Sequence, residues 1–280
     1  MKLALREICA RHVAAPAASA PVLKSVSLQL ASGESAAVIG PSGAGKTTLL
    51  HVAAAALKPT AGELRLHEQD PWQIGAARLK ALRGQLFLAP QNPPLPPRQR
   101  VITAVLAARL PSQSLWASVR SLVYPSDIPA AHDALAHFDL SDKLFERVDR
   151  LSGGERQRVG LSRALLAPAT LWLIDEPLSS LDPTRAQQAI RSLVEGAHTR
   201  GVTLLATLHH VEMALAHFPR IIGLRNGEVA FDLPAAQVSA EHLRSLYAQH
   251  EDELLASVAA ADADDNTGGP TPAAVVMHCR

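Results

Sequence analysis

A short glycine-rich motif at 40–47 constrains this chain more than any other feature. It reads GPSGAGKT and matches the pattern G-x-x-x-x-G-K-[ST] at every fixed position. The apolar run at 35–39 precedes the motif and a helical pattern at 46–58 follows it, so the motif joins an expected buried strand to an expected helix. Backbone N–H groups in such a loop surround a phosphate, and the helix N-terminus adds positive potential. The motif predicts binding of a nucleoside triphosphate.

Two side chains of this motif have separate predicted roles. Lys46 is expected to reach the β- and γ-phosphates, and the hydroxyl of Thr47 is expected to ligate Mg²⁺. The residues predicted to contact the nucleotide here are Gly40, Pro41, Ser42, Gly43, Ala44, Gly45, Lys46, Thr47 and Thr48.

A pair of carboxylates follows a second apolar run, at 171–174. Ligands of open α/β sheets bind at the carboxyl ends of the strands, which is where Asp175 and Glu176 would lie. Asp175 is predicted to hold Mg²⁺ directly or through water, and Glu176 to act as the general base on the attacking water. An acidic cap on a strand end is the alternative explanation, and the phosphate-binding motif favours the catalytic one.

A second pair of glycines has two possible explanations. Ser152 and Glu155 flank Gly153 and Gly154 and form the pattern of a capping box, which any helix start can use. Two consecutive glycines, however, cost conformational entropy at a helix start. They indicate that something approaches the backbone closely at this point.

Further apolar and helical patterns indicate an α/β fold. Alternation at 22–30 predicts a half-buried strand, and the runs at 171–174 and 202–207 predict buried strands. Helical patterns at 156–166 and 184–199 separate these runs, which is typical of βαβ units and a parallel sheet.

The middle of the chain has a different pattern. Five prolines fall within 90–97, so this stretch is expected to be a stiff connector between two parts. Residues 101–150 are expected to be mostly helical, with breaks at Pro111 and at Tyr124 and Pro125.

Composition excludes several classes of protein. The net charge of +1 argues against a dedicated nucleic-acid binder. No run reaches the roughly 18 apolar residues of a membrane span. Cys9 and Cys279 lie at opposite ends and predict no disulfide framework. The tail, from about 251 to 280, is small, polar and acidic and is expected to be disordered.

The order and spacing of these motifs resemble those of ABC-type ATPase subunits. The resemblance covers residues 1 to about 250 and includes the 40–48 loop, the 151–155 segment, the carboxylate pair, and also Gln91, Ser180, Leu181, Asp182 and His209. It implies a P-loop NTPase, RecA-like α/β core with an antiparallel β-subdomain, and a helical subdomain at about 92–165. The 90–97 connector falls at the junction of those two lobes.

The resemblance also implies an activity, cofactors and an assembly. The activity is ATP hydrolysis, with ATP and Mg²⁺ bound. Two such domains meet head to tail, so Ser152, Gly153 and Gly154 would face ATP held by the partner, and a homodimer with a second ATPase subunit is expected on this ground. Gln91 matches the glutamine that contacts Mg²⁺ and the attacking water, and His209 matches the histidine that contacts the γ-phosphate.

Three positions depart from the family pattern. His12 stands where relatives carry an aromatic residue that stacks on adenine, which puts nucleobase affinity in doubt. His210 follows His209 where many relatives have Asp or Gln, and it is interpreted as a neighbour of the site. Thr103 lies in a segment where an Asn is often found, and no consequence follows from this difference.

The subfamily resemblance is to the ATP-binding subunits of phosphonate importers. It rests on 108–127, on 208–215, and on 223–227 with Leu246 and Tyr247 beyond. It implies a peripheral protein on the cytoplasmic face of the membrane, bound to permease subunits that work with a solute-binding protein. The alternatives are an importer ATPase for another small polar solute, and a soluble ABC-type ATPase of a cytosolic phosphonate-degrading complex. A nucleic-acid-associated ABC ATPase is disfavoured because it usually needs a longer chain.

Overall fold

The computed structural model describes residues 1–248 except 13–15, 17–18 and 124–126. A six-stranded sheet, with strand order β5-β6-β7-β3-β8-β9, forms its centre. The first five strands in that order pair in parallel, and β9 pairs antiparallel to β8. The strands are β3 (Ser35–Ile39), β5 (Leu86–Ala89), β6 (Leu171–Asp175), β7 (Thr203–Thr207), β8 (Arg220–Arg225) and β9 (Glu228–Pro234).

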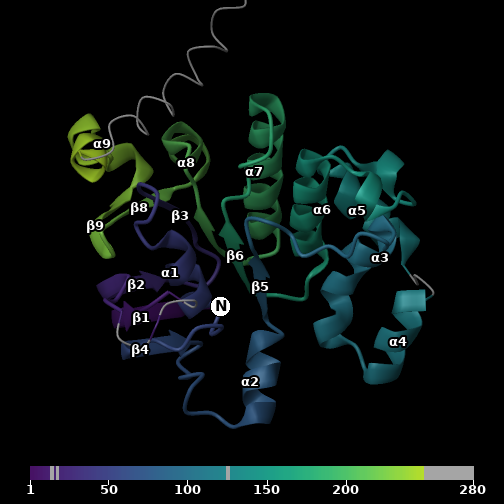
Figure 1. Ribbon diagram of the computed structural model, residues 1–280, viewed down its shortest axis with the longest axis horizontal. Coiled ribbons are helices and arrows are strands. Elements are labelled where there is room, and N and C mark those ends of the chain that lie inside the picture. The colour runs from purple at the N-terminus through teal and green to yellow at the C-terminus, as the bar shows by residue number, and fades with distance from the viewer. Residues whose placement is uncertain (13–15, 17–18, 124–126, 249–280) are drawn as a thin grey trace, which may run out of the picture.

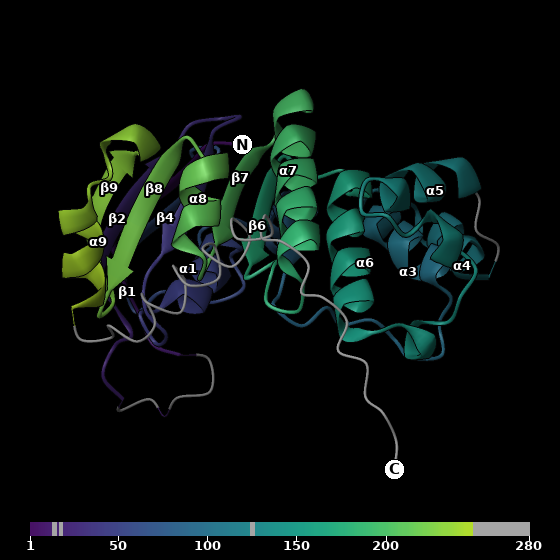
Figure 2. The same ribbon diagram turned by 90° about the horizontal axis from the view of Figure 1, so that it is seen from above.

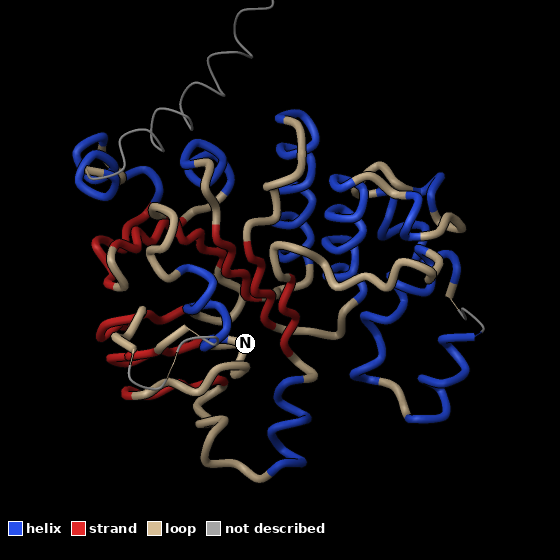
Figure 3. The backbone as a smooth tube through the Cα atoms, viewed as in Figure 1, coloured by secondary structure: helices blue, strands red, loops and turns tan. Residues whose placement is uncertain are grey.

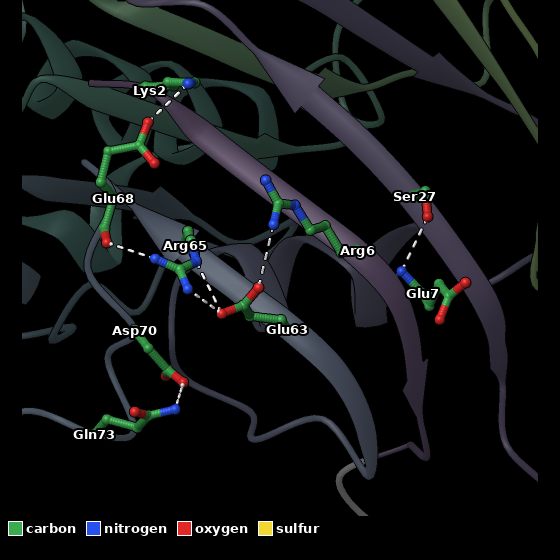
Figure 4. A network of polar contacts seen from close by, with 9 residues as sticks. All are labelled: Lys2, Arg6, Glu7, Ser27, Glu63, Arg65, Glu68, Asp70 and Gln73. Carbon is green, nitrogen blue, oxygen red and sulfur yellow. Dashed lines mark hydrogen bonds and ion pairs between the residues drawn. The ribbon is translucent and has the colours of Figure 1, made fainter.

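A second, antiparallel sheet lies to one side of the first (Figure 1). Its strand order is β2-β1-β4, formed by β1 (Leu3–Ala10), β2 (Leu23–Leu30) and β4 (Ala61–Leu66). Its exposed face carries an ion-pair ladder in which Glu63 joins Arg6 and Arg65 (Figure 4). Such exposed pairs contribute little stability, so the buried face holds this sheet in place.

Helix α1 (Lys46–Ala53) packs between the two sheets. It contacts β1 on one side and β6 and β7 on the other. Its side chains Leu49, Leu50 and Val52 are fully buried in the hydrophobic core between the two sheets. The phosphate-binding motif is therefore held between two sheets at the start of a rigid helix.

The other face of the central sheet is covered by α7 (Pro183–Thr199) and α8 (Val211–His217) (Figure 2). Asp182 caps α7 by accepting a hydrogen bond from the backbone N–H of Arg185, and Pro183 occupies its first turn. The shorter helices α2 (Ala76–Arg83) and α9 (Ala240–Tyr247) lie at the periphery.

The chain between β5 and β6 forms a helical lobe (Figure 3). Its elements are α3 (Val101–Leu106), the 3-10 helix η1 (Ala107–Ser112), α4 (Leu115–Val123), α5 (Ile128–Ala136), the 3-10 helices η2 (Ser141–Lys143) and η3 (Val148–Arg150), and α6 (Gly153–Leu166). A last 3-10 helix, η4 (Ala235–Gln237), follows β9. The 90–97 connector is irregular as predicted and enters this lobe from β5.

The break predicted near Pro111 is present, because η1 ends at Ser112 and Gln113 is extended, with φ −97° and ψ 150°, before α4 begins at Leu115. One local prediction needs correction. The helix predicted at 46–58 ends at Ala53, since Ala55 is left-handed with φ 51° and the N–H groups of Ala56 and Leu57 both donate to the carbonyl of His51. Tyr124, Pro125 and the tail at 251–280 lie outside the described residues.

Two predictions from composition can be compared with the structure. Within the part of the chain that the structure describes, Cys9 is a free thiol. No helix in that part is long and apolar enough to cross a membrane.

Candidate functional site

The phosphate-binding loop leaves the buried strand β3 and turns sharply into α1. Gly40 and Gly45 have φ of 152° and 103°, a region that favours glycine. A Cβ on Gly40 would lie 2.0 Å from the carbonyl oxygen of Leu224, and one on Gly45 would lie 2.9 Å from Leu23 Cδ2. No side chain caps the N-terminus of α1, so its first N–H groups are directed at the loop. This is the predicted phosphate cradle.

The Lys46 side chain lies inside the loop. It is 5% exposed, and its Nζ donates hydrogen bonds to the carbonyls of Gly40 at 2.7 Å and Pro41 at 3.3 Å. These contacts fix a positive charge beside the turn that would surround a polyphosphate. Contact of Lys46 with the β- and γ-phosphates stays a prediction, and the position of the side chain inside the loop is compatible with it.

Asp175 is the last residue of β6 and Glu176 follows it, and both are oriented by a residue that the sequence did not single out. The hydroxyl of Thr207, at the end of β7, donates to Asp175 Oδ1 at 2.7 Å. The hydroxyl oxygen of Thr207 in turn accepts a hydrogen bond from the backbone N–H of Glu176 at 3.0 Å. Thr207 is fully buried, and a hydroxyl at the end of an otherwise apolar strand is the signal that could have revealed it.

Glu176 joins the other two predicted catalytic residues directly. Its Oε1 lies 2.5 Å from Nε2 of His209, and its Oε2 accepts from Nε2 of Gln91 at 2.8 Å. The backbone of Glu176 is left-handed, with φ 45°, which turns the side chain out of the line of β6. Residues 91, 176 and 209, separated along the sequence, thus meet at one carboxylate.

The sheet topology explains this convergence. Gln91, Glu176 and His209 each lie just beyond the carboxyl end of β5, β6 and β7, which are neighbours in the sheet, and the phosphate loop follows the next strand, β3. Carboxyl ends of parallel strands share one edge. Four strand ends therefore build the site.

Electrostatics keep Glu176 ionised. Burial raises the pKa of Glu176, but the hydrogen bond and charge of His209, together with the charge of Lys46, outweigh it and lower the pKa below its ordinary value. A carboxylate at neutral pH is the form that accepts a proton.

A cleft of about 340 Å³ opens over the loop. Glu176 lies at one side, and His12 and Val22 line it with residues 43–48. His12 is thus beside the phosphate loop, where the resemblance predicts the adenine-stacking residue.

The predicted Mg²⁺ ligands offer oxygen donors suited to that ion. Asp175 supplies a buried carboxylate, Thr47 a hydroxyl and Gln91 an amide oxygen. Mg²⁺ prefers one or two such ligands together with phosphate oxygens and water over an all-protein cage. The three predicted ligands are therefore of the kind that Mg²⁺ takes when it binds together with a nucleotide. The described residues contain no group of three or more His, Cys, Asp or Glu side chains that could hold a metal ion.

The two glycines at the start of α6 have different surroundings. Ser152 and Glu155 form the predicted capping box, with hydrogen bonds of 3.2 and 2.7 Å. A Cβ on Gly154 would lie 2.8 Å from the carbonyl oxygen of Ser180, so this close approach comes from the chain itself. A Cβ on Gly153 would meet nothing within 4 Å. Gly153 is therefore open to an external partner.

A family model described as ABC transporter matches residues 23–179, more than half of the chain. The chain belongs to the ABC transporter family. This match spans the phosphate loop, Gln91, the α6 N-terminus and the carboxylate pair.

Relatives and solved structures agree with this membership. The chain is 63% identical over 280 residues to the phosphonates import ATP-binding protein PhnC 2 of Albidiferax ferrireducens, covering 100% of both chains. It is 53% identical over 229 residues to a PhnC 2 of Pseudomonas aeruginosa, covering 82% of this chain and 86% of that protein. A dimeric, post-hydrolysis structure of the ATP-binding cassette MJ0796 with ADP and Pi has a TM-score of 0.70 at 24% identity, covering 83% and 98% of the two chains.

The fold class and family predicted from the motifs are thus confirmed. The chain has the ABC ATPase fold, with the α/β core, antiparallel sheet and helical lobe that the resemblance implies. An ABC ATPase domain binds nucleotide, and the loop at 40–48 is the part of this chain predicted to do so.

Proposed function

We propose that this chain is the ATP-binding and ATP-hydrolysing subunit of an ABC importer for phosphonates. The observation that carries the hydrolytic role is the meeting of Gln91 and His209 on the two oxygens of Glu176, beside the phosphate loop. The solute class rests on the names of relatives, two of which match the chain over its full length at 63% identity.

Each residue of the site has a role in this proposal. The N–H groups of the loop and Lys46 hold the β- and γ-phosphates, and Thr47, Asp175 and Gln91 hold Mg²⁺. When bound, Mg²⁺ supplies charge neutralisation at the phosphates. Glu176 accepts the proton of the attacking water, and His209 contacts the γ-phosphate and orients the carboxylate. Ser152, Gly153 and Gly154 contact the nucleotide of a second subunit.

The assembly follows from the same residues. Two copies of the chain close around two ATP molecules, and closure moves the permease subunits that the helical lobe contacts beside Gln91. The complex lies on the cytoplasmic face of the membrane and receives solute from a binding protein. ATP drives the cycle because it binds the closed dimer more tightly than the open one.

Replacing Glu176 with Gln tests the hydrolytic role. The variant keeps the shape of the side chain but cannot accept a proton, so we expect ATP binding to persist and hydrolysis to fall about 10²- to 10⁴-fold. ATP-dependent dimerisation, followed by size-exclusion chromatography, should increase. Glu195→Gln, an exposed change on α7, is the matched control and should behave as the wild type. Hydrolysis by Glu176→Gln at the wild-type rate would remove Glu176 from this role.

Affinity purification from detergent-solubilised membranes tests the transport role. We expect polytopic permease subunits and a solute-binding protein that binds alkylphosphonates. A binding protein that prefers another small polar solute would correct the solute class. Recovery of soluble enzymes alone would overturn the importer and leave an ATPase of a cytosolic complex.

A further inference from the structure

The charges of this chain are unevenly distributed. Residues 71–126 contain seven Lys or Arg residues and no Asp or Glu, whereas the rest of the chain contains 20 Lys or Arg and 26 Asp or Glu. The near-zero net charge therefore conceals a strongly basic segment inside an acidic remainder. This segment supplies α2, the connector, α3, η1 and α4.

Most cations of this segment are not used inside the protein. Arg83 donates to the carbonyl of Ala55, and Arg109 pairs with Asp127. The other five are exposed, and within the described residues none of them forms an ion pair; they are Arg78, Lys80, Arg98, Arg100 and Arg120. Their charge is available to an external partner.

Helix α4 adds exposed apolar side chains to this charge. Trp116 is 84% exposed and Val119 is 52% exposed. They are three positions apart, so they lie on one face of the helix, with Arg120 beside them. Trp172, by contrast, is fully buried in the core. A tryptophan this exposed on a soluble surface indicates a contact that the chain does not make by itself.

Helices α2 and α4 lie on the same side of the molecule. Both extend to its lower edge in Figure 1, α2 from the centre and α4 from the helical lobe. Between them, a hollow of about 440 Å³ is lined by Lys80 and Gly84 of the α2 region and by Pro111 and Ser112 of η1, the element that leads into α4. We call Arg78, Lys80, Trp116, Val119 and Arg120 the basic face.

We propose that the basic face binds the anionic phospholipid headgroups of the membrane surface, with Trp116 in the interfacial layer. Clustered cations attract an anionic leaflet, and tryptophan partitions to the level of the headgroups. A short helix with apolar side chains beside Arg is suited to lie along such a surface. This contact would hold the subunit at the membrane independently of the permease.

The distribution of the side chains favours a lipid surface over an acidic protein segment. The cations are spread over two separate helices rather than lining one groove, and Trp116 is an exposed residue of α4. A broad, fluid, uniformly charged surface can meet all of them together. The inference goes beyond the proposed function, because lipid binding requires neither ATP hydrolysis nor a solute.

Vesicle binding by the full chain tests this proposal. We expect co-sedimentation with vesicles of phosphatidylcholine and phosphatidylglycerol, little with phosphatidylcholine alone, and weakening as salt rises. The triple variant Arg78→Gln, Lys80→Gln, Arg120→Gln should bind at least about tenfold more weakly, because each cation near an anionic surface contributes roughly fivefold. The control triple Lys24→Gln, Lys58→Gln, Arg191→Gln removes the same charge from exposed sites outside the segment and should bind as the wild type.

Trp116 offers a second, independent readout. Bromine-labelled acyl chains should quench its fluorescence on anionic vesicles, and Trp116→Phe should lose that quenching. Equal weakening by both triple variants would mean that net charge alone governs binding and would overturn the proposal. Binding only to vesicles containing permease subunits, regardless of lipid charge, would also overturn it and assign the basic face to a protein partner. Neither result bears on hydrolysis, which Glu176→Gln tests separately.

Discussion

Helices α1 and α6 both begin at a glycine-rich motif, yet their N-termini are capped differently. Helix α1 begins after Gly45 with no side-chain cap, whereas α6 begins after Ser152 with a complete capping box. At α1 the first N–H groups, the helix dipole and Lys46 all act on the same cleft. At α6 the Glu155 carboxylate already accepts from the N–H of Ser152 at 2.7 Å.

The difference shows which of the two can bind an anion unaided. The backbone hydrogen bond from Ser152 is the main cause that lowers the pKa of Glu155, so a negative charge already satisfies the start of α6. Of these two N-termini, that of α1 is therefore the one predicted to bind phosphate in a lone subunit. In the proposed dimer, Gly153 would meet the nucleotide of the partner.

Among changes at these two helix N-termini, removing the Lys46 charge at α1 should have the largest effect, and the quantity it changes is the affinity for ATP. Lys46→Ala is expected to weaken ATP binding by about 10- to 100-fold, because charged hydrogen bonds contribute roughly 1.5 to 3 kcal/mol each. Isothermal titration calorimetry of the single subunit measures it. Lys58→Ala, an exposed lysine beyond α1, is the control and should leave affinity unchanged. Unchanged ATP affinity in Lys46→Ala would contradict the prediction that the N-terminus of α1 binds the phosphates.

Replacing each glycine at the start of α6 with alanine, one at a time, distinguishes their roles. Gly153→Ala meets open space within the subunit, so we expect unchanged thermal stability and ATP affinity, but about tenfold slower hydrolysis once dimers form, as expected of a crowded interface. Gly154→Ala should instead lower stability, because its Cβ would lie 2.8 Å from the carbonyl of Ser180. Thermal melts and ATPase assays over a range of protein concentrations compare the two. Full activity of Gly153→Ala would show that nothing approaches α6.

Removing the charge of the α6 cap should have the smallest effect. Glu155→Gln is expected to cost about 0.5 kcal/mol of unfolding free energy, the size of a charge at a helix N-terminus. The folded pKa of Glu155 is lowered, so its contribution is complete above the unfolded pKa of about 4.3 and disappears as pH falls through the folded value. Urea denaturation at several pH values should show the two proteins converging in acid. A constant difference at all pH values would contradict the role of the charge.

Much of the central fold could be predicted from local patterns. The mostly apolar runs at 35–39, 171–174 and 202–207 became β3, β6 and β7, since strands buried in a parallel sheet are covered on both faces. The end of α1 was predicted too late, because the left-handed Ala55 has no sequence signal comparable to a glycine. Local patterns did not predict the strands β1, β8 and β9, and the resemblance implied only that an antiparallel β-subdomain exists. The pairing of these strands depends on residues far away in the sequence.

The site was predictable to a different degree at each residue. The phosphate loop carries its chemistry in eight consecutive residues, and the carboxylate pair carries its chemistry in two, Asp175 and Glu176. Gln91 and His209 are ordinary residues in loops, and only the sheet order brings them onto Glu176. Thr207 was missed because a threonine is a common strand residue, and its role depends on the neighbouring strand.

The two contacts on Glu176 also tie three neighbouring strands to one side chain. Both carboxylate oxygens are engaged, Oε1 by His209 and Oε2 by Gln91, so a water molecule that reaches Glu176 must share an oxygen with one of them. The two partners stand on opposite sides of β6, Gln91 in the connector to the helical lobe and His209 beyond the end of β7. A displacement of either segment would therefore change the surroundings of the same carboxylate.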